Sequence, residues 1–128
     1  MSAKKLGVLV HGAGWVAGEH IKAFKANPHT DVLAISSRKL ESCERKADEA
    51  GLSKVACYTD YDKALAHDGV DIVSVCTPQH LHCENTIAAA QAGKHIVIEK
   101  PIANSPDEMR AMRNAVRKAH ANYRRSGR

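Results

Sequence analysis

The segment Lys5-Leu-Gly-Val-Leu-Val-His-Gly-Ala-Gly-Trp-Val-Ala17 decides the fold, because an apolar run typical of a buried strand leads into a glycine-rich turn. Gly12, Gly14 and Ala17 occupy the three positions of the G-x-G-x-x-G/A pattern, directly between a predicted strand and a predicted helix. The first glycine permits a tight turn, the second lets the backbone approach a diphosphate, and free N–H groups at the helix start face the anion. The segment therefore predicts a dinucleotide-binding turn; the alternative is a glycine-rich turn without a ligand.

Strand-like runs and helical periods alternate along the rest of the chain. The predicted strands are residues 5–10, 31–36, 55–58, 70–76 and 95–99. The predicted helices begin near Ala17, Leu40, Tyr61 and Leu81, and a capping box at Ser105–Glu108 opens the last one. Five strands that alternate with five helices predict an α/β fold, a Rossmann-type doubly wound parallel sheet in three layers, α/β/α. In such a sheet ligands bind beyond the carboxyl ends of the strands, so the loops there form the candidate site.

Composition places the chain among ordinary globular proteins, because 128 residues, 44% of them hydrophobic and 26% charged, amount to one domain. No apolar run is long enough to cross a bilayer and no signal-peptide core follows Met1, so we expect an unexported, cytoplasmic protein that does not bind membranes. The four cysteines form no CxxC pair, and we expect them to be free thiols.

The net charge of +5 comes from the C-terminal part of the sequence. Seven of the 19 basic residues lie between Arg110 and Arg128, where no residue is acidic. The rest of the sequence has 12 basic and 14 acidic residues. Such a run is typical of a solvated helix face and tail, and Tyr123 is its only aromatic residue, so we do not expect nucleic-acid binding. We expect residues 1–122 to form the nucleotide-binding domain and residues 123–128 to form a disordered basic tail.

The second predicted strand ends in Ser36-Ser37-Arg38-Lys39, where a dinucleotide fingerprint normally carries an acidic residue for the adenosine ribose. Without a carboxylate, nothing there repels a 2′-phosphate. Ser37 can donate a hydrogen bond and the planar guanidinium of Arg38 suits a phosphate, so the loop favours NADP, with NAD left open. The alternative is that Arg38 and Lys39 are solvated charges at a helix start.

Two cysteines and two histidines lie close together after the fourth predicted strand, in Cys76-Thr-Pro-Gln-His-Leu-His-Cys83. Their spacing matches no common structural zinc pattern, so no metal site is predicted. His82 falls in the first turn of a helix, where an imidazole bonds either loop backbone or a ligand. The sequence weighs these two interpretations equally.

The fifth predicted strand ends in Glu99-Lys100-Pro101. A lysine at the carboxyl edge of the sheet, beside a carboxylate and a rigid proline, can donate a proton or polarise a substrate oxygen. Taken alone, a Lys-Pro pair is more often a surface lysine before a turn.

Together, several motifs resemble the glucose-fructose oxidoreductase and inositol dehydrogenase family (Gfo/Idh/MocA), over about residues 5–120. They are Gly12-Ala-Gly-Trp-Val-Ala-Gly-Glu-His20, Tyr58-Thr-Asp-Tyr61, Thr77-Pro-Gln-His-Leu-His82, Ala92-Gly-Lys-His95 and Glu99-Lys-Pro101. Members of this family transfer hydride between NAD(P) and sugar-like or other hydroxyl-bearing substrates. The resemblance implies a Rossmann-type domain in which protein groups align the nicotinamide and manage a proton on the substrate oxygen.

The resemblance also implies roles for individual residues of this chain. Residues that would line the diphosphate are Gly12, Gly14, Trp15 and Val16, and those that would face the adenosine ribose are Ser37 and Arg38. Residues that would border the ribose or nicotinamide are Thr77, Pro78 and His82, with Glu99 and Lys100 nearest the nicotinamide. Lys100 would be the family's catalytic lysine.

The family's C-terminal α/β domain, which supplies substrate contacts and the remaining catalytic residues, has no counterpart in these 128 residues. Whether the chain by itself is an enzyme therefore stays open. One hypothesis makes it the cofactor half of a longer dehydrogenase, and the other makes it a stand-alone NADP-binding module without catalysis of its own. A small-molecule substrate is expected only with the missing domain, and an uncovered sheet edge leaves a homo-oligomer open.

Overall fold

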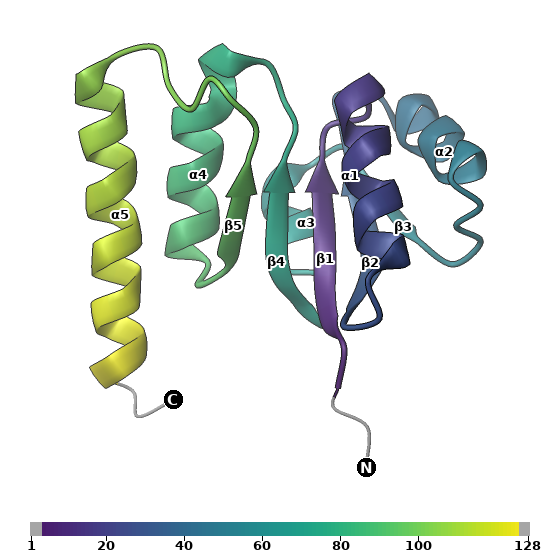
Figure 1. Ribbon diagram of the computed structural model, residues 1–128, viewed down its shortest axis with the longest axis horizontal. Coiled ribbons are helices and arrows are strands. Elements are labelled where there is room, and N and C mark those ends of the chain that lie inside the picture. The colour runs from purple at the N-terminus through teal and green to yellow at the C-terminus, as the bar shows by residue number, and fades with distance from the viewer. Residues whose placement is uncertain (1–3, 126–128) are drawn as a thin grey trace.

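Strands and helices alternate along residues 4–125, which are the residues that the computed structural model describes (Figure 1). The strands are β1 (Leu6–His11), β2 (Thr30–Ser36), β3 (Ala56–Tyr58), β4 (Val70–Val75) and β5 (His95–Ile98). The helices are α1 (Trp15–Ala26), α2 (Leu40–Glu49), α3 (Tyr61–Leu65), α4 (His82–Gln91) and α5 (Pro106–Arg125), and a 3₁₀ turn, η1 (Gln79–Leu81), precedes α4. Every predicted strand and helix is present, whereas η1 was not predicted.

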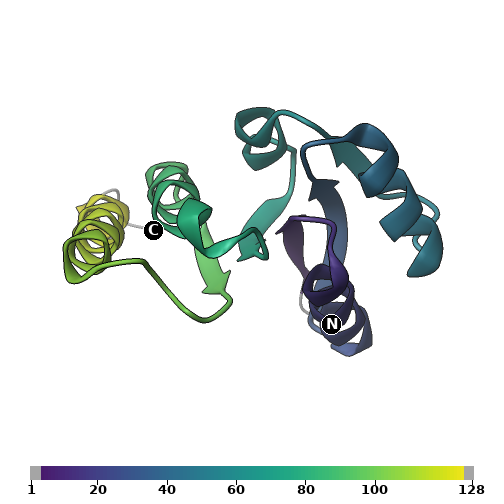
Figure 2. The same cartoon turned by 90° about the horizontal axis from the view of Figure 1, so that it is seen from above.

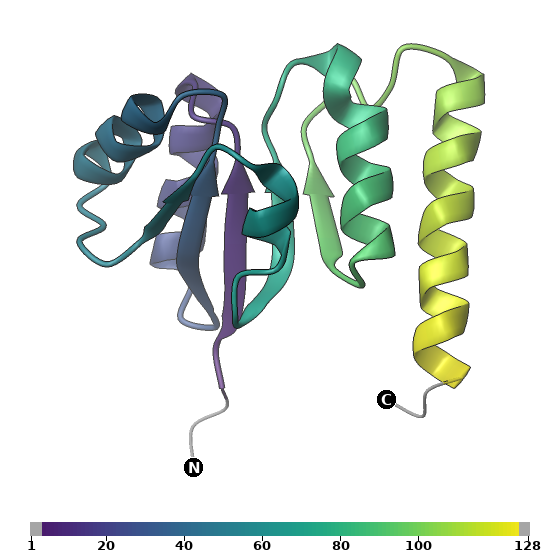
Figure 3. The same cartoon turned by 180° about the vertical axis from the view of Figure 1, so that it is seen from behind.

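The five strands form one parallel sheet in the order β3-β2-β1-β4-β5. The chain moves outward from β1 to β3, then crosses to the other side of β1 and continues to β5. α1 and α2 cover one face of the sheet, and α3 and α4 cover the opposite face (Figure 2 and Figure 3). This arrangement confirms the doubly wound, three-layer prediction. After β1 the chain continues to α1 on one face of the sheet, and after β4 it continues to α4 on the other face. A crevice therefore forms between the carboxyl ends of these two neighbouring strands.

The sheet has an apolar core on each face, and β1 contributes to both. Val8 and Val10 pack in the cluster beneath α1 together with Ile21, whereas Leu9 packs on the opposite face together with Ala89 of α4. All five side chains are completely buried. Since a strand that is buried on both faces has no solvent-facing side, its apolar run is continuous and does not alternate.

α5 lies at the outside of the fold, where it runs beside α4 and away from the sheet (Figure 1). Met112 of its apolar stripe is buried, whereas Met109 and Val116 are 50% and 44% exposed. β5 is the last strand of the sheet on this side, among the residues that the structure describes.

The start of α5 confirms the predicted cap at Ser105, whereas Glu108 bonds the residue before the cap and not the cap itself. The hydroxyl of Ser105 accepts the N–H of Glu108 at 3.2 Å, and the carboxylate of Glu108 accepts the N–H of Asn104 at 2.8 Å. The helix then continues to Arg125, three residues into the stretch that we expected to be a disordered tail. The rest of that tail, residues 126–128, lies outside the described residues.

Candidate nucleotide-binding site

The turn between β1 and α1 requires glycine at its first position. Gly12 has a φ of +123°, and a Cβ there would lie 2.7 Å from the carbonyl oxygen of Cys76, in the loop after β4. The N–H of Gly12 donates to the carbonyl oxygen of Ser36 at 2.7 Å. The chain therefore leaves β1 between the ends of β2 and β4 through a space in which no side chain fits.

Gly14, the second glycine of the pattern, faces open space, because a Cβ there would meet no heavy atom within 4 Å. It is the N-cap residue of α1, and no side-chain hydrogen bond caps this helix. The N–H of Gly18 donates to the carbonyl oxygen of Gly14 at 3.3 Å, and the N–H groups before it lack an intrahelical acceptor. An uncapped helix start with open space in front of it is suited to an anion such as a diphosphate.

A cavity of about 630 Å³ lies over this turn, at the carboxyl ends of β1, β2 and β4. Its lining includes eight of the predicted cofactor-binding residues, namely Gly12, Gly14, Trp15, Val16, Ser37, Arg38, Thr77 and Pro78. The rest of the lining is made by His11, Ala13, Lys39, Ser42, Cys76 and Leu81. Three loops that are far apart in the sequence thus meet in one cavity, whereas the predicted residues His82, Glu99 and Lys100 are not part of its lining.

The cavity lining carries cations, Arg38 and Lys39, and no carboxylate from the residues described. Ser36, where an acidic residue is typical, is completely buried, and its hydroxyl lies 2.6 Å from Nδ1 of His11. The hydroxyl of Ser37 donates to the carbonyl oxygen of Lys39 at 2.7 Å. Since that proton is already used within the loop, Arg38 is the exposed side-chain donor nearest to it in the sequence.

The helices differ in how their N-terminal N–H groups are capped. α3 is capped by the carboxylate of Asp60, which accepts the N–H of Lys63 at 3.1 Å, and α5 is capped by Ser105. α1, α2 and α4 have no side-chain cap. Residues at these three starts that line the cavity are Val16, Ser42 and Leu81. The starts of α1 and α2 therefore bring the positive ends of their dipoles to the cavity, whereas at the start of α4 the N–H groups of Leu81 and His82 donate to carbonyl oxygens of Pro78 and Gln79.

His11, the last residue of β1, lines the cavity but was not predicted as a site residue. Its ring stacks on that of Tyr61 in α3, with centroids 3.8 Å apart and planes 13° apart. Burial lowers the pKa of His11 to about 4, although a backbone hydrogen bond at Ser36 opposes the shift. A neutral imidazole therefore borders the glycine turn between β1 and α1 at neutral pH. The only sequence signal was its position directly before the first glycine of the pattern.

His82 is 2% exposed, and its ring bonds the backbone of two loops. Nε2 lies 2.9 Å from the carbonyl oxygen of Thr77, and Nδ1 lies 2.9 Å from that of Pro101. A neutral ring has only one N–H donor, so it can donate a hydrogen bond to only one of these two carbonyl oxygens at a time. Of the two interpretations that the sequence left open, the structure shows the contacts with loop backbone, and a contact with the cofactor stays a prediction.

Glu99 bonds to α1 and does not line the cavity. Its carboxylate lies 2.7 Å from Nε2 of His20, and Nδ1 of His20 lies 2.6 Å from the hydroxyl of Ser74. The hydrogen bond from His20 is the main reason that the pKa of Glu99 is lowered, against the opposing effect of desolvation. The next residue, Lys100, is exposed.

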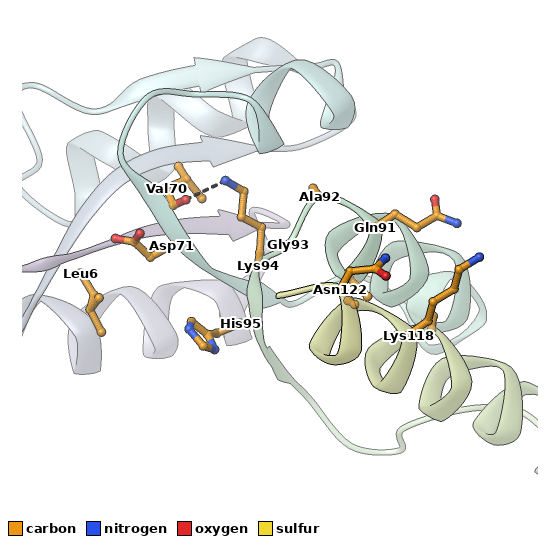
Figure 4. Close-up of a pocket in the computed structure, with 13 residues that line it drawn as sticks. Leu6, Val70, Asp71, Gln91, Ala92, Gly93, Lys94, His95, Lys118 and Asn122 are labelled. Atoms are coloured by element: carbon orange, nitrogen blue, oxygen red, sulfur yellow. Dashed lines mark hydrogen bonds between the residues drawn. The ribbon is translucent and has the colours of Figure 1, made fainter. Parts of the chain in front are cut away.

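A second and larger cavity, of about 780 Å³, lies at the opposite end of the sheet (Figure 4). It is bounded by the first residues of β4 and β5 and by the last turns of α5. Two of its charged side chains already bond the backbone. Lys94 donates to the carbonyl oxygen of Val70 at 2.8 Å, and Asp71 accepts the N–H of Gly7 at 2.9 Å. This cavity is remote from the loops that carry the predicted site residues.

Within residues 4–125, no group of three or more histidine, cysteine or acidic side chains is placed to hold a metal ion. No helix in that part of the chain has both the length and the apolar character that crossing a membrane requires. The four cysteines are free thiols. Burial raises the pKa of Cys76 to about 11, so this cavity-lining thiol is neutral at physiological pH.

The sequence model of the family described as "Oxidoreductase family, NAD-binding Rossmann fold" (GFO_IDH_MocA) matches residues 6–125. The chain belongs to the Gfo/Idh/MocA oxidoreductase family. This match confirms the resemblance inferred from the motifs, and it assigns the doubly wound sheet to the family's NAD-binding Rossmann domain.

Individual Gfo/Idh/MocA relatives match over nearly the whole chain. D-glucoside 3-dehydrogenase of Escherichia coli is 32% identical over 92% of this chain and 33% of its own length. A structure of levoglucosan dehydrogenase in complex with NADH and L-sorbose has a TM-score of 0.82 and 31% identity, covering 90% of this chain and 32% of that one. A 3-ketoreductase from Actinomadura kijaniata, in complex with TDP-benzene and NADP, has a TM-score of 0.82 and 30% identity, covering 91% and 36%.

The chain spans about a third of the length of these Gfo/Idh/MocA proteins. The two solved structures hold different cofactors, NADH in one and NADP in the other. Family membership therefore does not choose between the two, and the choice depends on the residues of this cavity.

Proposed function

We propose that this chain is the cofactor-binding domain of an oxidoreductase that prefers NADP(H) and acts on a sugar-like or other hydroxyl- or carbonyl-bearing substrate. The observation that carries the preference is the cavity lining, where Arg38 and Lys39 stand without a carboxylate among the residues described. A carboxylate at this position would bond the ribose hydroxyls and repel a 2′-phosphate. A guanidinium instead binds phosphate with a planar pair of N–H donors.

The proposed binding mode follows the cavity from its phosphate turn to its far wall. The diphosphate lies on the uncapped start of α1, over Gly12 and Gly14, where the open space in front of Gly14 admits it. The loop Thr77–Pro78 forms the opposite wall. The bound cofactor supplies hydride chemistry, and in this proposal Lys100 manages the proton on the substrate oxygen.

The proposed substrate class rests on relatives such as the D-glucoside 3-dehydrogenase of Escherichia coli. Hydride transfer requires a substrate held against the nicotinamide and shielded from water. The cavity described here is made by one edge of a sheet. We therefore place the substrate between this domain and a second one, as the greater length of the relatives suggests.

A fluorescence titration with NADPH and NADH, at one fixed salt concentration, tests the proposal. We expect the parent chain to bind NADPH about tenfold more tightly than NADH. In Arg38→Ala we expect the affinity for NADPH to fall about tenfold and the affinity for NADH to change less than about twofold. Arg45→Ala is the matched control, because Arg45 is an exposed α2 arginine that pairs with Glu49 and lies outside the cavity lining. Equal affinities for the two cofactors would contradict the preference, and binding of neither would contradict the cofactor role.

A further inference from the structure

The segment Glu99–Pro101 is held on both sides of Lys100 by histidines from other elements. His20 of α1 reaches the carboxylate of Glu99, with 2.7 Å between Nε2 and Oε2. His82 of α4 reaches the carbonyl oxygen of Pro101, with 2.9 Å between that oxygen and Nδ1. The two helices cover opposite faces of the sheet, so the two contacts approach the segment from opposite sides.

The first of these contacts continues into the core. Nδ1 of His20 lies 2.6 Å from the hydroxyl of Ser74, a completely buried residue of β4. When Nε2–H donates to the carboxylate of Glu99, Nδ1 is left to accept the hydroxyl proton of Ser74. A Ser-His-Glu order also occurs in hydrolytic triads, but no substrate reaches a serine that is buried inside the sheet. The arrangement therefore orients the carboxylate of Glu99.

The second contact joins the segment to the cavity wall. Nε2 of His82 lies 2.9 Å from the carbonyl oxygen of Thr77, which lines the nucleotide cavity. The hydroxyl of Thr77 in turn donates to Oδ1 of Asn85, one turn further along α4, at 2.6 Å. The ring of His82 in α4 thus lies between the loops after β4 and β5, and in its neutral form it donates to one of the two carbonyl oxygens at a time.

The carboxylate of Glu99 is bonded to His20, and the nearby charge of Lys100 contributes less than this bond to lowering the pKa of that carboxyl. A free Glu99 carboxylate could fold onto the ammonium of Lys100, but it is bonded to His20 instead. Lys100 takes part in none of the ion pairs found in the described part of the chain. Its ammonium is thus left available at the carboxyl edge of the sheet.

We propose that His20 and His82 are positioning residues that fix the backbone on either side of Lys100, with His20 holding the carboxylate of Glu99 so that the ammonium of Lys100 forms no close ion pair with it. This inference rests on the proposed function, which gives Lys100 the proton chemistry. Neither histidine needs to touch cofactor or substrate. His20 contacts Glu99 and His82 contacts Pro101, so together they fix the backbone position of Lys100.

Backbone ¹⁵N relaxation at Lys100 and Ile102, in the whole 128-residue chain, is the direct test. We expect order parameters of about 0.85 in the parent chain and below about 0.6 at these residues in His20→Ala and in His82→Ala. His20→Gln, which can still donate to Glu99, should restore most of the loss in His20→Ala. His67→Ala is the matched control, because His67 also bonds a side chain, the Tyr58 hydroxyl at 2.7 Å, but in another part of the fold.

A second measurement reports on the hydrogen bond between His20 and Glu99 and is insensitive to a general increase in backbone mobility. The carboxyl ¹³C titration of Glu99 should report a lowered pKa in the parent chain, because His20 donates to it. In His20→Ala that pKa should rise toward its ordinary value, and in His82→Ala and His67→Ala it should not change. If His82→Ala does not fold, the His20 variants and Ser74→Ala, which removes the second partner of His20, decide the question.

The proposal is overturned if the order parameters at Lys100 stay at the parent value in His20→Ala and in His82→Ala, or if they fall equally in His67→Ala. Its failure is distinct from that of the proposed function. NADPH that binds the parent chain while Lys100 is insensitive to both histidines would refute only the positioning role. Absence of NADPH binding would refute the proposed function whatever the relaxation data show.

Discussion

The two ends of the candidate site are held in place by different means. The phosphate end is one short turn whose shape depends on backbone, with Gly12 between the ends of two strands and uncapped amides at the start of α1. The lysine end is held by side chains whose partners are distant in sequence, 79 residues apart for His20 and Glu99 and 19 for His82 and Pro101. A turn whose shape depends on the backbone can be specified by a local sequence motif. Contacts between side chains that are distant in sequence form only after the sheet has assembled.

This difference predicts different sensitivities to mutation. At the glycine turn, a side chain added at Gly12 should disrupt the fold, whereas one added at Gly14 should leave the fold intact and weaken binding. At the lysine end, loss of one side chain frees a segment while the fold persists. The predictions below test the comparison, beginning with the largest expected effect.

Gly12→Val should destabilise the whole domain. The new Cβ would lie 2.7 Å from the carbonyl oxygen of Cys76, at a φ of +123° that a β-branched residue does not adopt without strain. Strain and steric overlap together predict a loss of about 4 kcal/mol in the free energy of unfolding, measured by urea denaturation. A variant as stable as the parent chain would show that the turn can rearrange, and the contrast between the two ends would fail.

Acid should weaken the two ends in different pH windows. The pKa of His11 is about 4 in the folded chain, below its ordinary value of 6.5, so the unfolded chain binds the proton first as pH falls. The free energy of unfolding should therefore fall by about 3 kcal/mol between pH 6.5 and pH 4. The pKa of Glu99 is also lowered, so its contribution is present above 4.5 and is lost as pH falls below that value.

Urea denaturation at a series of pH values measures this dependence. His11→Asn keeps a polar partner for Ser36 but cannot titrate, so it should flatten the window between 6.5 and 4 and leave the window below 4.5 in place. An unchanged slope between 6.5 and 4 in His11→Asn would show that the loss of stability originates elsewhere in the chain.

Gly14→Ala should have the smallest effect on the fold and a selective effect on binding. Gly14 has a φ of −84°, which any residue adopts, and its Cβ would enter open space. We expect the free energy of unfolding to change by less than about 0.5 kcal/mol and the affinity for NADPH to fall about tenfold, because the methyl group occupies the path of the diphosphate. Unchanged affinity would place the diphosphate away from this turn.

Local patterns predicted the fold well because each element carries its own signal. The strand before Gly12 is continuously apolar since both of its faces are buried, and the cap at Ser105 opens α5 where it was expected. The uncapped start of α1 follows from the glycines themselves. For the same reason, eight of the predicted cofactor-binding residues lie together in one cavity.

Partners that come together only in three dimensions were beyond these patterns. Ser37 was considered as a donor to the cofactor, but its hydroxyl donates to Lys39. Glu99 was placed nearest the nicotinamide by resemblance, and its carboxylate bonds His20. His11 was overlooked, because its burial depends on the stacking of Tyr61 from another element. In each case the side chain could be identified from the sequence, but its partner could not.

The sequence by itself determined the order of strands and helices, the glycine turn with its free amides and the absence of a carboxylate after β2, since each depends on neighbouring residues. Only the tertiary structure decided which side chains are already engaged. His20, Glu99 and His82 each have a partner on a different element, and that pairing arises when α1, β4, β5 and α4 pack around the same edge of the sheet. Periodicity specifies an element through short-range sterics, whereas the bonding state of a polar side chain depends on long-range packing.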